Sequence, residues 1–279
     1  MSIWEALILG IVQGITEFLP VSSSGHLVLL QRIFGINEPS LVFETAVHGG
    51  TLLAVFVVLW RDIWNILRRI IQPLTLYLII ATIPTVVAAL LFKSRIEEAF
   101  ATGAFLGFAF LTTSVLLFVS EILFRRSKKS GGLMAELEGP RAARGQDEMN
   151  LIDALFIGLF QAVAIVPGIS RSGATISAAL SRRLDRDFAA RFSFLLSIPA
   201  ILGALILHAR ELVDAGMGVG TISLLPIAVG TISAGIVAFF AIRFVLKIVR
   251  ERSLWGFAFY TGILGILVLI DKFGSNFFF

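Results

Sequence analysis

The chain has 279 residues, of which 57% are hydrophobic and only 15% are charged, and its mean hydropathy is +0.92. These values exclude a soluble globular domain and indicate an integral membrane protein. The chain contains no cysteine, which excludes disulfides, a thiolate nucleophile and cysteine-ligated metals. Its formal net charge of +4 comes from basic residues in short loops, where they set membrane topology, so we expect no nucleic-acid partner. The first residues lack the basic region of a signal peptide, and we expect no cleaved leader.

The first segment, residues 2–34, is apolar on both sides of a break at Pro20. Neither half is long enough to cross a hydrocarbon core of roughly 30 Å. A helix that enters, breaks near mid-depth and returns to the same side explains this pattern, because non-helical backbone is tolerated there when protein buries it. Before the break, Gln13 and Glu17 lie four residues apart on one helix face. The break is followed by Ser22, Ser23, Ser24, Gly25 and His26.

Six longer apolar segments are predicted to cross the bilayer, three after each broken segment. They lie at about 43–60, 75–92, 103–124, 192–209, 221–242 and 255–271. Between the third and the fourth, residues 125–150 contain several glycines and charges of both signs. This composition predicts a flexible linker between two halves, and it leaves open an amphipathic surface helix.

The second half begins with another broken segment, residues 151–182, in which Pro167 and Gly168 make the break. A shift of 148 positions places Gly10 on Gly158, Gln13 on Gln161 and Ser22 on Ser170. The chain is therefore predicted to be a duplication, with halves at 1–124 and 151–279. The polar residues after the second break are Ser170, Arg171, Ser172, Gly173 and Thr175.

Four loops carry clusters of basic residues, and the positive-inside rule places all four in the cytoplasm. They are Arg61, Arg68 and Arg69; Arg125, Arg126, Lys128 and Lys129; Arg182, Arg183, Arg186 and Arg191; and Arg243, Lys247, Arg250 and Arg252. Each half then has one re-entrant segment and three spans, an odd number, so the halves insert with opposite orientation. The sequence thus predicts an all-α inverted repeat with six transmembrane helices and two re-entrant helix-turn-helix segments.

The two breaks are predicted to meet near the middle of the membrane and to form an anion site. A helix N-terminus carries unpaired N–H groups and a partial positive charge, so it attracts phosphate. Arg171 adds a planar cation that suits phosphate oxygens. Glu17 suits a divalent cation or a general base, His26 a proton transfer, and the Ser23 hydroxyl an attack on phosphorus. These residues predict a ligand with several phosphate oxygens, and water remains an alternative nucleophile.

Two motifs in these segments resemble those of a known family. Gln-x-x-x-Glu-Phe-Leu-Pro-Val-Ser-Ser-Ser-Gly-His at 13–26, with Pro-Gly-Ile-Ser-Arg-Ser-Gly-Ala-Thr at 167–175, is similar to the undecaprenyl-diphosphate phosphatases of the bacitracin-resistance type. The resemblance runs essentially from end to end and includes the span count and the pair Phe43 and Glu44. It implies a bacterial plasma-membrane enzyme that removes one phosphate from undecaprenyl diphosphate. That reaction recycles the lipid carrier for cell-wall precursors and gives bacitracin resistance.

The resemblance also implies roles for single residues. Glu17, Ser23, His26 and Arg171 are expected to be catalytic. Gln13 and Glu17 are expected to hold a divalent cation, Mg²⁺ or Ca²⁺. The expected phosphate contacts are Ser22, Ser24, Gly25, Ser170, Ser172, Gly173 and Thr175. Many relatives have a glutamate where this chain has Gln13, which puts a two-carboxylate metal site in doubt. We expect a polyprenyl diphosphate lipid as partner and a cavity that opens to the extracytoplasmic side, and a homodimer is left open.

Each role has a simpler structural alternative. Glu17 and Arg171 can merely neutralise each other's buried charge, and Ser22 and Ser172 are typical of helix caps. Glu44 and His48 lie one turn apart on a span, where a supporting or packing role is favoured over a place at the border of the site.

The second functional hypothesis is a polyprenyl-phosphate transporter or flippase, because inverted repeats with re-entrant tips are a transporter layout. A transporter needs an anion site and a gate, but it does not need a carboxylate, a histidine and a serine close together. A type-2 phosphatidic acid phosphatase is disfavoured, because the histidine that this family needs after the arginine falls at Ser177. The chain has no phosphate-binding Gly-x4-Gly-Lys loop, which argues against an ATP-driven pump.

Overall fold

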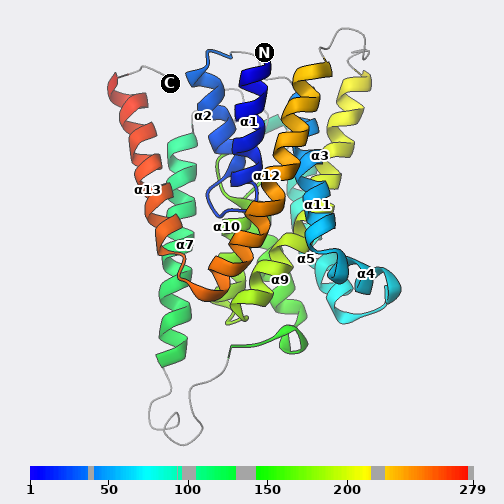
Figure 1. The fold of residues 1–279 in the computed structure, drawn as a ribbon. Helices are drawn as coiled ribbons and strands as arrows, with labels where there is room; N and C mark the ends of the chain where they lie inside the picture. The colour runs from blue at the N-terminus through cyan, green and yellow to red at the C-terminus, as the bar shows by residue number, and fades with distance from the viewer. Residues whose placement is uncertain (37–40, 93, 96–104, 130–142, 215–223, 276–279) are drawn as a thin grey trace, which may run out of the picture.

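The structure is a computed structural model that describes residues 1–36, 41–92, 94–95, 105–129, 143–214 and 224–275 (Figure 1). The described residues are almost entirely helical and contain no β-strand beyond one isolated bridge between Arg144 and Leu184. Six helices are long and apolar enough to cross a membrane, which confirms the predicted all-α polytopic fold and its six spans. They are α3 (Leu41–Val58), α5 (Pro73–Leu91), α7 (Leu106–Lys129), α11 (Arg186–Asp214), α12 (Leu224–Glu251) and α13 (Trp255–Ile270).

Several helices continue beyond the apolar segments that predicted them. The helix α11 begins at Arg186 and α12 ends at Glu251, so both include basic residues that were assigned to loops. Arginine and lysine are good helix formers, whereas hydropathy marks only the part of a helix that lies in hydrocarbon. The first predicted basic loop likewise contains a helix, α4 (Trp60–Arg68), whose Ile63 is buried while Trp60 is exposed.

Four shorter helices form the two broken segments: α1 (Ile3–Thr16), α2 (Ser23–Ile33), α9 (Leu151–Val163) and α10 (Arg171–Ser181). The helices α1 and α9 begin with the same capping box, formed by Ser2 with Glu5 and by Asn150 with Asp153. These pairs are 148 positions apart, which is the offset of the predicted duplication. Both helices end a few residues before a proline, which disfavours helical backbone in the residue that precedes it.

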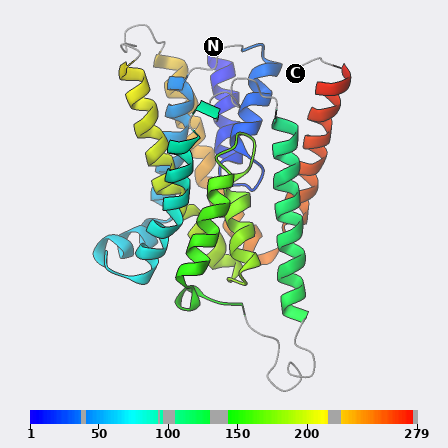
Figure 2. The ribbon, with the colours of Figure 1, turned by 180° about the vertical axis from the view of Figure 1, so that it is seen from behind.

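The turns of the two broken segments meet inside the protein. Figures 1 and 2 show α1 and α2 toward the end of the bundle where both termini lie, and α9 and α10 toward the opposite end. Between the turns, Ser172 Oγ donates to the Leu19 carbonyl at 2.9 Å, and the Gly168 N–H donates to Ser24 Oγ at 3.2 Å. The orientation of the two segments in a membrane stays a prediction, as do the boundaries at 1–124 and 151–279. Residues 130–142 of the predicted linker lie outside the described residues.

Close backbone packing fixes the two short helices that lead into these turns. The helix α1 packs against α12, and α9 packs against α5. A Cβ atom added to Gly10 would overlap the Gly230 carbonyl, and one added to Gly158 would overlap the Ala81 carbonyl. Small residues allow this approach, which gives helices in a bilayer their van der Waals contact. Each first short helix is thereby packed on a span of the other half.

Two buried carboxylates bind arginines at the basic end of the bundle. Glu121 on α7 accepts from Arg186 Nη2 at 2.7 Å. Asp153, at the first turn of α9, accepts from Arg144 Nη2 at 2.5 Å and from Arg182 Nε at 2.7 Å. Because a buried charge without a partner is costly, these ion pairs hold neighbouring helix ends and the segment of Arg144 together.

Candidate functional site

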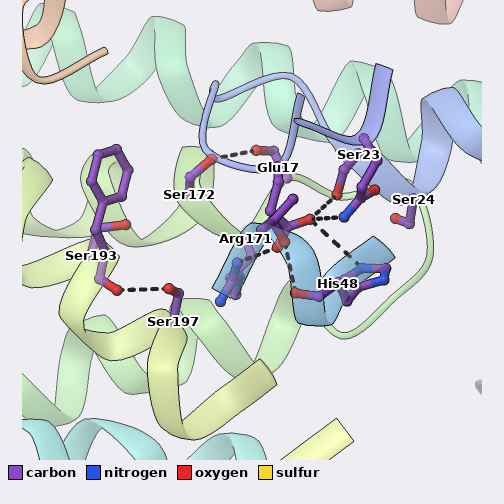
Figure 3. Close-up of polar contacts among 12 residues, drawn as sticks. Glu17, Ser23, Ser24, His48, Arg171, Ser172, Ser193 and Ser197 are labelled. Atoms are coloured by element: carbon purple, nitrogen blue, oxygen red, sulfur yellow. Dashed lines mark hydrogen bonds and ion pairs between the residues drawn. The ribbon is translucent and has the colours of Figure 1, made fainter. Parts of the chain in front are cut away.

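Glu17 lies at the centre of a polar cluster where the two turns meet, as Figure 3 shows. Its Oε1 accepts from Arg171 Nη2 at 2.5 Å. Its Oε2 accepts from Ser23 Oγ at 2.6 Å and from Gln13 Nε2 at 2.9 Å. The Glu17 residue is 6% exposed, so its carboxylate depends on these donors for solvation. The structure thus brings together four residues that the motifs singled out.

The local fold explains how these side chains converge. Glu17 is the C-cap of α1, and its N–H donates to the Gln13 carbonyl at 3.0 Å, which places both side chains on one face. Ser23 and Arg171 are the first residues of α2 and α10. The N-termini of two helices therefore face the same cluster, and their first N–H groups have no partner within the helix. This arrangement favours an anion.

Serine side chains build both helix starts. Ser22 Oγ accepts from the Gly25 N–H at 3.2 Å, and Ser170 Oγ accepts from the Gly173 N–H at 3.0 Å, so both cap a helix. Ser22 has φ 73°, a left-handed conformation that is strained for a residue with a side chain and that recurs at functional sites. The expectation that Ser22 caps a helix is confirmed.

The cap expected at Ser172 is wrong. Ser170 occupies the N-cap position of α10, and Ser172 donates instead to the carbonyl of Leu19 in the other half. Thr175 Oγ1 hydrogen-bonds to the Arg171 carbonyl at 2.9 Å and to Ser193 Oγ at 2.6 Å. These contacts support the turns, and direct binding of phosphate by the glycines and hydroxyls stays a prediction.

The hydrogen-bond partners of His26 are Ser22 and Tyr260 rather than Glu17 or Ser23. Its Nδ1–H donates to the Ser22 carbonyl at 2.6 Å, because a carbonyl oxygen can only accept. Nε2 then accepts from the Tyr260 hydroxyl at 2.7 Å, and the two rings stack with centroids 5.7 Å apart. Neither nitrogen of His26 faces the Ser23 hydroxyl, and its catalytic role stays a prediction.

His48 lies beside the carboxylate, although the sequence favoured a supporting or packing role over a place at the border of the site. Its Nε2 lies 3.7 Å from Glu17 Oε2. Its Nδ1–H donates to the Glu44 carbonyl at 2.7 Å and thereby fixes the ring. The one-turn spacing of Glu44 and His48 was the only signal in the sequence. That spacing could not show that α3 packs beside the turn of the first broken segment, some thirty positions earlier in the chain.

Two buried polar atoms at the site have no hydrogen-bond partner among the described residues: Arg171 Nη1 and Gln13 Oε1. An unpaired buried donor or acceptor costs free energy, and native proteins rarely leave one without a reason. Arg171 Nη1 offers N–H groups to an anion, and Gln13 Oε1 offers an oxygen ligand to a cation. Both features therefore suit a phosphate that arrives with a metal ion.

The side chains fit a divalent cation that is shared with a phosphate ligand. Among the described residues, no three His, Asp or Glu side chains are grouped to hold a metal. The available donors are Glu17, the unpaired oxygen of Gln13, and Nε2 of His48. Mg²⁺ is commonly bound by one or two carboxylates, with substrate phosphates and water as further ligands. One carboxylate with two neutral donors matches that pattern better than an all-protein cage.

Comparison with known proteins identifies the family. Residues 6–267 match the family described as bacitracin resistance protein BacA. The chain belongs to the BacA family. Together with the six apolar helices, this membership establishes an integral membrane protein.

Full-length relatives support the assignment to the BacA family. "Undecaprenyl-diphosphatase" of Carboxydothermus hydrogenoformans is 42% identical over 277 residues, which cover 99% of this chain and 100% of the relative. "Undecaprenyl-diphosphatase 3" of Bacillus cereus is 43% identical over 274 residues, 98% of each chain. "Undecaprenyl-diphosphatase" of Halothermothrix orenii is 39% identical, with 97% of this chain and 98% of the relative covered. These names are those of phosphatases, and they do not favour the transporter hypothesis.

Proposed function

We propose that this protein hydrolyses undecaprenyl diphosphate to undecaprenyl phosphate and inorganic phosphate, and so recycles the lipid carrier of cell-wall synthesis. The observation that carries the proposal is the contact of one buried carboxylate with a serine hydroxyl and with an arginine that retains an unpaired Nη1. A nucleophile, a base and an anion-binding cation lie within hydrogen-bond reach, as phosphoryl transfer requires.

Ser23 is the proposed nucleophile. Its hydroxyl donates to Glu17 Oε2, so the carboxylate can take the proton as Oγ attacks the terminal phosphorus. The Oγ–P bond forms, the P–O bond to the bridging oxygen breaks, and undecaprenyl phosphate leaves. Water then attacks the phosphoserine, inorganic phosphate leaves, and Ser23 recovers its proton. Direct attack by water at the first step is the alternative that the experiment below tests.

Arg171 and the two helix N-termini stabilise the charge that develops on the phosphoryl oxygens. Nη2 of Arg171 is held by Glu17, which leaves Nη1 to donate to the substrate. Donors that are fixed before the reaction cost no reorganisation during it, and they act strongly where water is excluded. The salt bridge to Glu17 therefore positions Arg171 and also balances its charge before substrate binds.

A divalent cation, Mg²⁺ or Ca²⁺, is part of the proposal. Glu17 and Gln13 would hold it, with His48 Nε2 as a further donor, and when bound it would offset charge on the diphosphate oxygens. The unpaired Gln13 Oε1 supports this assignment. Gln13 Nε2 donates to Glu17 Oε2, and a rotation of the Gln13 amide by a half turn would place its oxygen there instead.

The inverted repeat and the placement of the site belong to the same proposal. Support comes from the capping boxes 148 positions apart and from the packing of each short helix on the other half. The described basic loops lie at the end of the bundle opposite the termini, as the positive-inside rule expects for the cytoplasm. We therefore place the protein in the bacterial plasma membrane, with the site open to the extracytoplasmic side.

Phosphate release from undecaprenyl diphosphate in detergent, with and without EDTA, tests the function. Glu17→Gln and Arg171→Ala are each expected to lower the rate about a hundredfold or more, because they remove the base and the anion-binding cation. Ser181→Ala is the control. Its hydroxyl donates to the Ser177 carbonyl at the far end of α10, and its rate should match the wild type.

Ser23→Ala separates the two possible nucleophiles. With substrate labelled in its terminal phosphate, the wild type should retain label in acid-quenched protein and Ser23→Ala should retain none. A Ser23→Ala variant that hydrolyses substrate at a wild-type rate would assign the attack to water. Folded wild type that binds the substrate but releases no phosphate would contradict the proposed function.

A further inference from the structure

A cavity of about 490 Å³ lies between α3, α4, α11 and α12, and it shares no lining residue with the Glu17 cluster. It is at the end of the bundle where the described basic loops lie, on the side of α4 in Figure 1. Its charged lining consists of Arg61, Arg191, Arg243 and Asp62. Val57 and Phe239 add an apolar wall.

Two of the three arginines in this cavity have no carboxylate partner among the residues that the structure describes. Arg191 binds Asp62 at 3.2 Å and Asp187 at 2.9 Å. Arg61 and Arg243 form no ion pair with any described residue, and Arg243 instead lies over the Phe239 ring at 5.4 Å from its centroid. An arginine that faces a cavity without a counter-ion is suited to an anionic ligand.

Exposed apolar side chains continue from this cavity along the outer surface of α3 and α12. On the side of α3 and α4, Leu53, Val57 and Trp60 are 65%, 64% and 54% exposed. On α12 the exposed residues are Ile232, Ile236 and Phe240. Each set recurs at helical spacing and forms one stripe. The helices α3 and α12 pack against each other, so the two stripes lie on neighbouring helices whose ends line the cavity of Arg61 and Arg243.

We propose that this cavity binds the headgroup of an anionic phospholipid of the phosphatidylglycerol class. The phosphate would lie between Arg61 and Arg243, and the two acyl chains would follow the stripes on α3 and α12. Basic pockets between transmembrane helices at the membrane surface bind anionic headgroups, and a tryptophan such as Trp60 is typical of that depth. The apolar stripes favour a lipid over a free anion, because they bury surface only against acyl chains.

Native mass spectrometry of the full-length protein in neutral detergent tests this site by titration with phosphatidylglycerol and phosphatidylcholine. The wild type should prefer phosphatidylglycerol. Arg61→Gln should weaken binding about fivefold, Arg243→Gln the same, and the double variant about thirtyfold. Arg61→Lys with Arg243→Lys should keep most of the preference, because the charge remains.

The matched control is Arg126→Gln with Arg250→Gln. It removes the same charge from the same end of the bundle, at exposed residues that do not line the cavity, and it should leave the lipid preference unchanged. All variants should keep wild-type phosphate release, which also reports their folding. The proposed site would be wrong if the control variant lost as much phosphatidylglycerol binding as the double variant, or if the wild type did not prefer phosphatidylglycerol over phosphatidylcholine. Soluble glycerol phosphate that binds as tightly as the lipid would show an anion site with no role for acyl chains.

Discussion

At the scale of single residues, the charge of Glu17 is already balanced before any ligand arrives. Arg171 neutralises it, and Gln13 and Ser23 add hydrogen bonds. A buried ion pair is tolerable only when its remaining donors and acceptors are satisfied, and here Arg171 Nη1 is not. A diphosphate satisfies that group but brings excess negative charge. The neutral Gln13 does not add to this charge, whereas a second carboxylate would.

Gln13→Glu is therefore expected to increase the dependence on a divalent cation. Two carboxylates about 3 Å apart repel each other unless a proton or a cation lies between them. We expect a lower melting temperature than wild type in EDTA. Affinity for Mg²⁺ or Ca²⁺ should rise about tenfold, since ligand charge tunes cation affinity. Thermal unfolding in detergent during a cation titration measures both effects without reference to activity.

Gln161→Glu is the control for this prediction. Gln161 lies 148 positions after Gln13 and is equally buried, but its Nε2 donates to Thr85 Oγ1 rather than to a carboxylate. The substitution should lower stability, and a cation should not restore it. If cations stabilise both variants equally, the effect does not arise at the Glu17 cluster and the assigned ligands are wrong.

The sequence predicts the contacts that lie within its two motifs and misses those that depend on other helices. Glu17 and Arg171 could be paired in advance, because the predicted inverted repeat brings the two turns together near the middle of the membrane. His48 could not be placed beside Glu17, since that contact depends on how α3 packs. The pairing of His26 with Tyr260 joins positions 234 residues apart and has no local signal.

At the scale of helices, backbone contact at glycine positions holds the turns in register. Gly158→Leu should therefore lower stability by about 1–3 kcal/mol, the range for overpacking, because the side chain would overlap the Ala81 backbone. It should also lower phosphate release, since α9 positions the turn that carries Arg171. Thermal unfolding and the phosphate assay on the same preparation measure both effects.

Gly203→Leu is the matched control for Gly158→Leu. Gly203 lies in a span, and a Cβ added there meets no atom within 4 Å. Leucine has a better helix propensity than glycine, so this variant should be as stable as the wild type or slightly more stable. A similar loss in both variants would mean that bulk alone, rather than contact with α5, causes the effect.

Hydropathy located the six spans but not the helix α4, because α4 is short and rich in charged residues. A transmembrane helix is recognised by its average apolarity, whereas α4 has Arg61, Asp62 and Arg68 among its nine residues and resembles a charged loop. Its apolar residues Trp60, Ile63, Trp64 and Leu67 recur at helical spacing on one face, and the charged residues lie on the other. This pattern of two faces is detected only by periodicity in so short a segment.

At the scale of the whole molecule, helices of the two predicted halves pack on one another. The helix α1 of the first half packs on α12 of the second, and α9 packs on α5, while α7 and α13 pack together. The site contains Glu17 and Ser23 from one half and Arg171 from the other. An isolated half would lack both the packing surface and the counter-ion, so we infer that the site forms only when both halves are folded.

The absence of native cysteine makes the membrane course of both broken segments testable with single introduced thiols. A re-entrant segment has both ends on one side of the membrane, whereas a span has them on opposite sides. In spheroplasts treated with an impermeant maleimide, Ser2→Cys and Ile33→Cys should both react. Asp147→Cys and Asp187→Cys flank the second segment, whose two ends are both predicted to lie in the cytoplasm. These two variants should therefore react only after the membrane is permeabilised. If the two members of either pair differ in labelling, that segment crosses the bilayer and the inverted repeat is wrong. The cysteine-free wild type sets the background, and phosphate release by each variant shows that the labelled protein is folded.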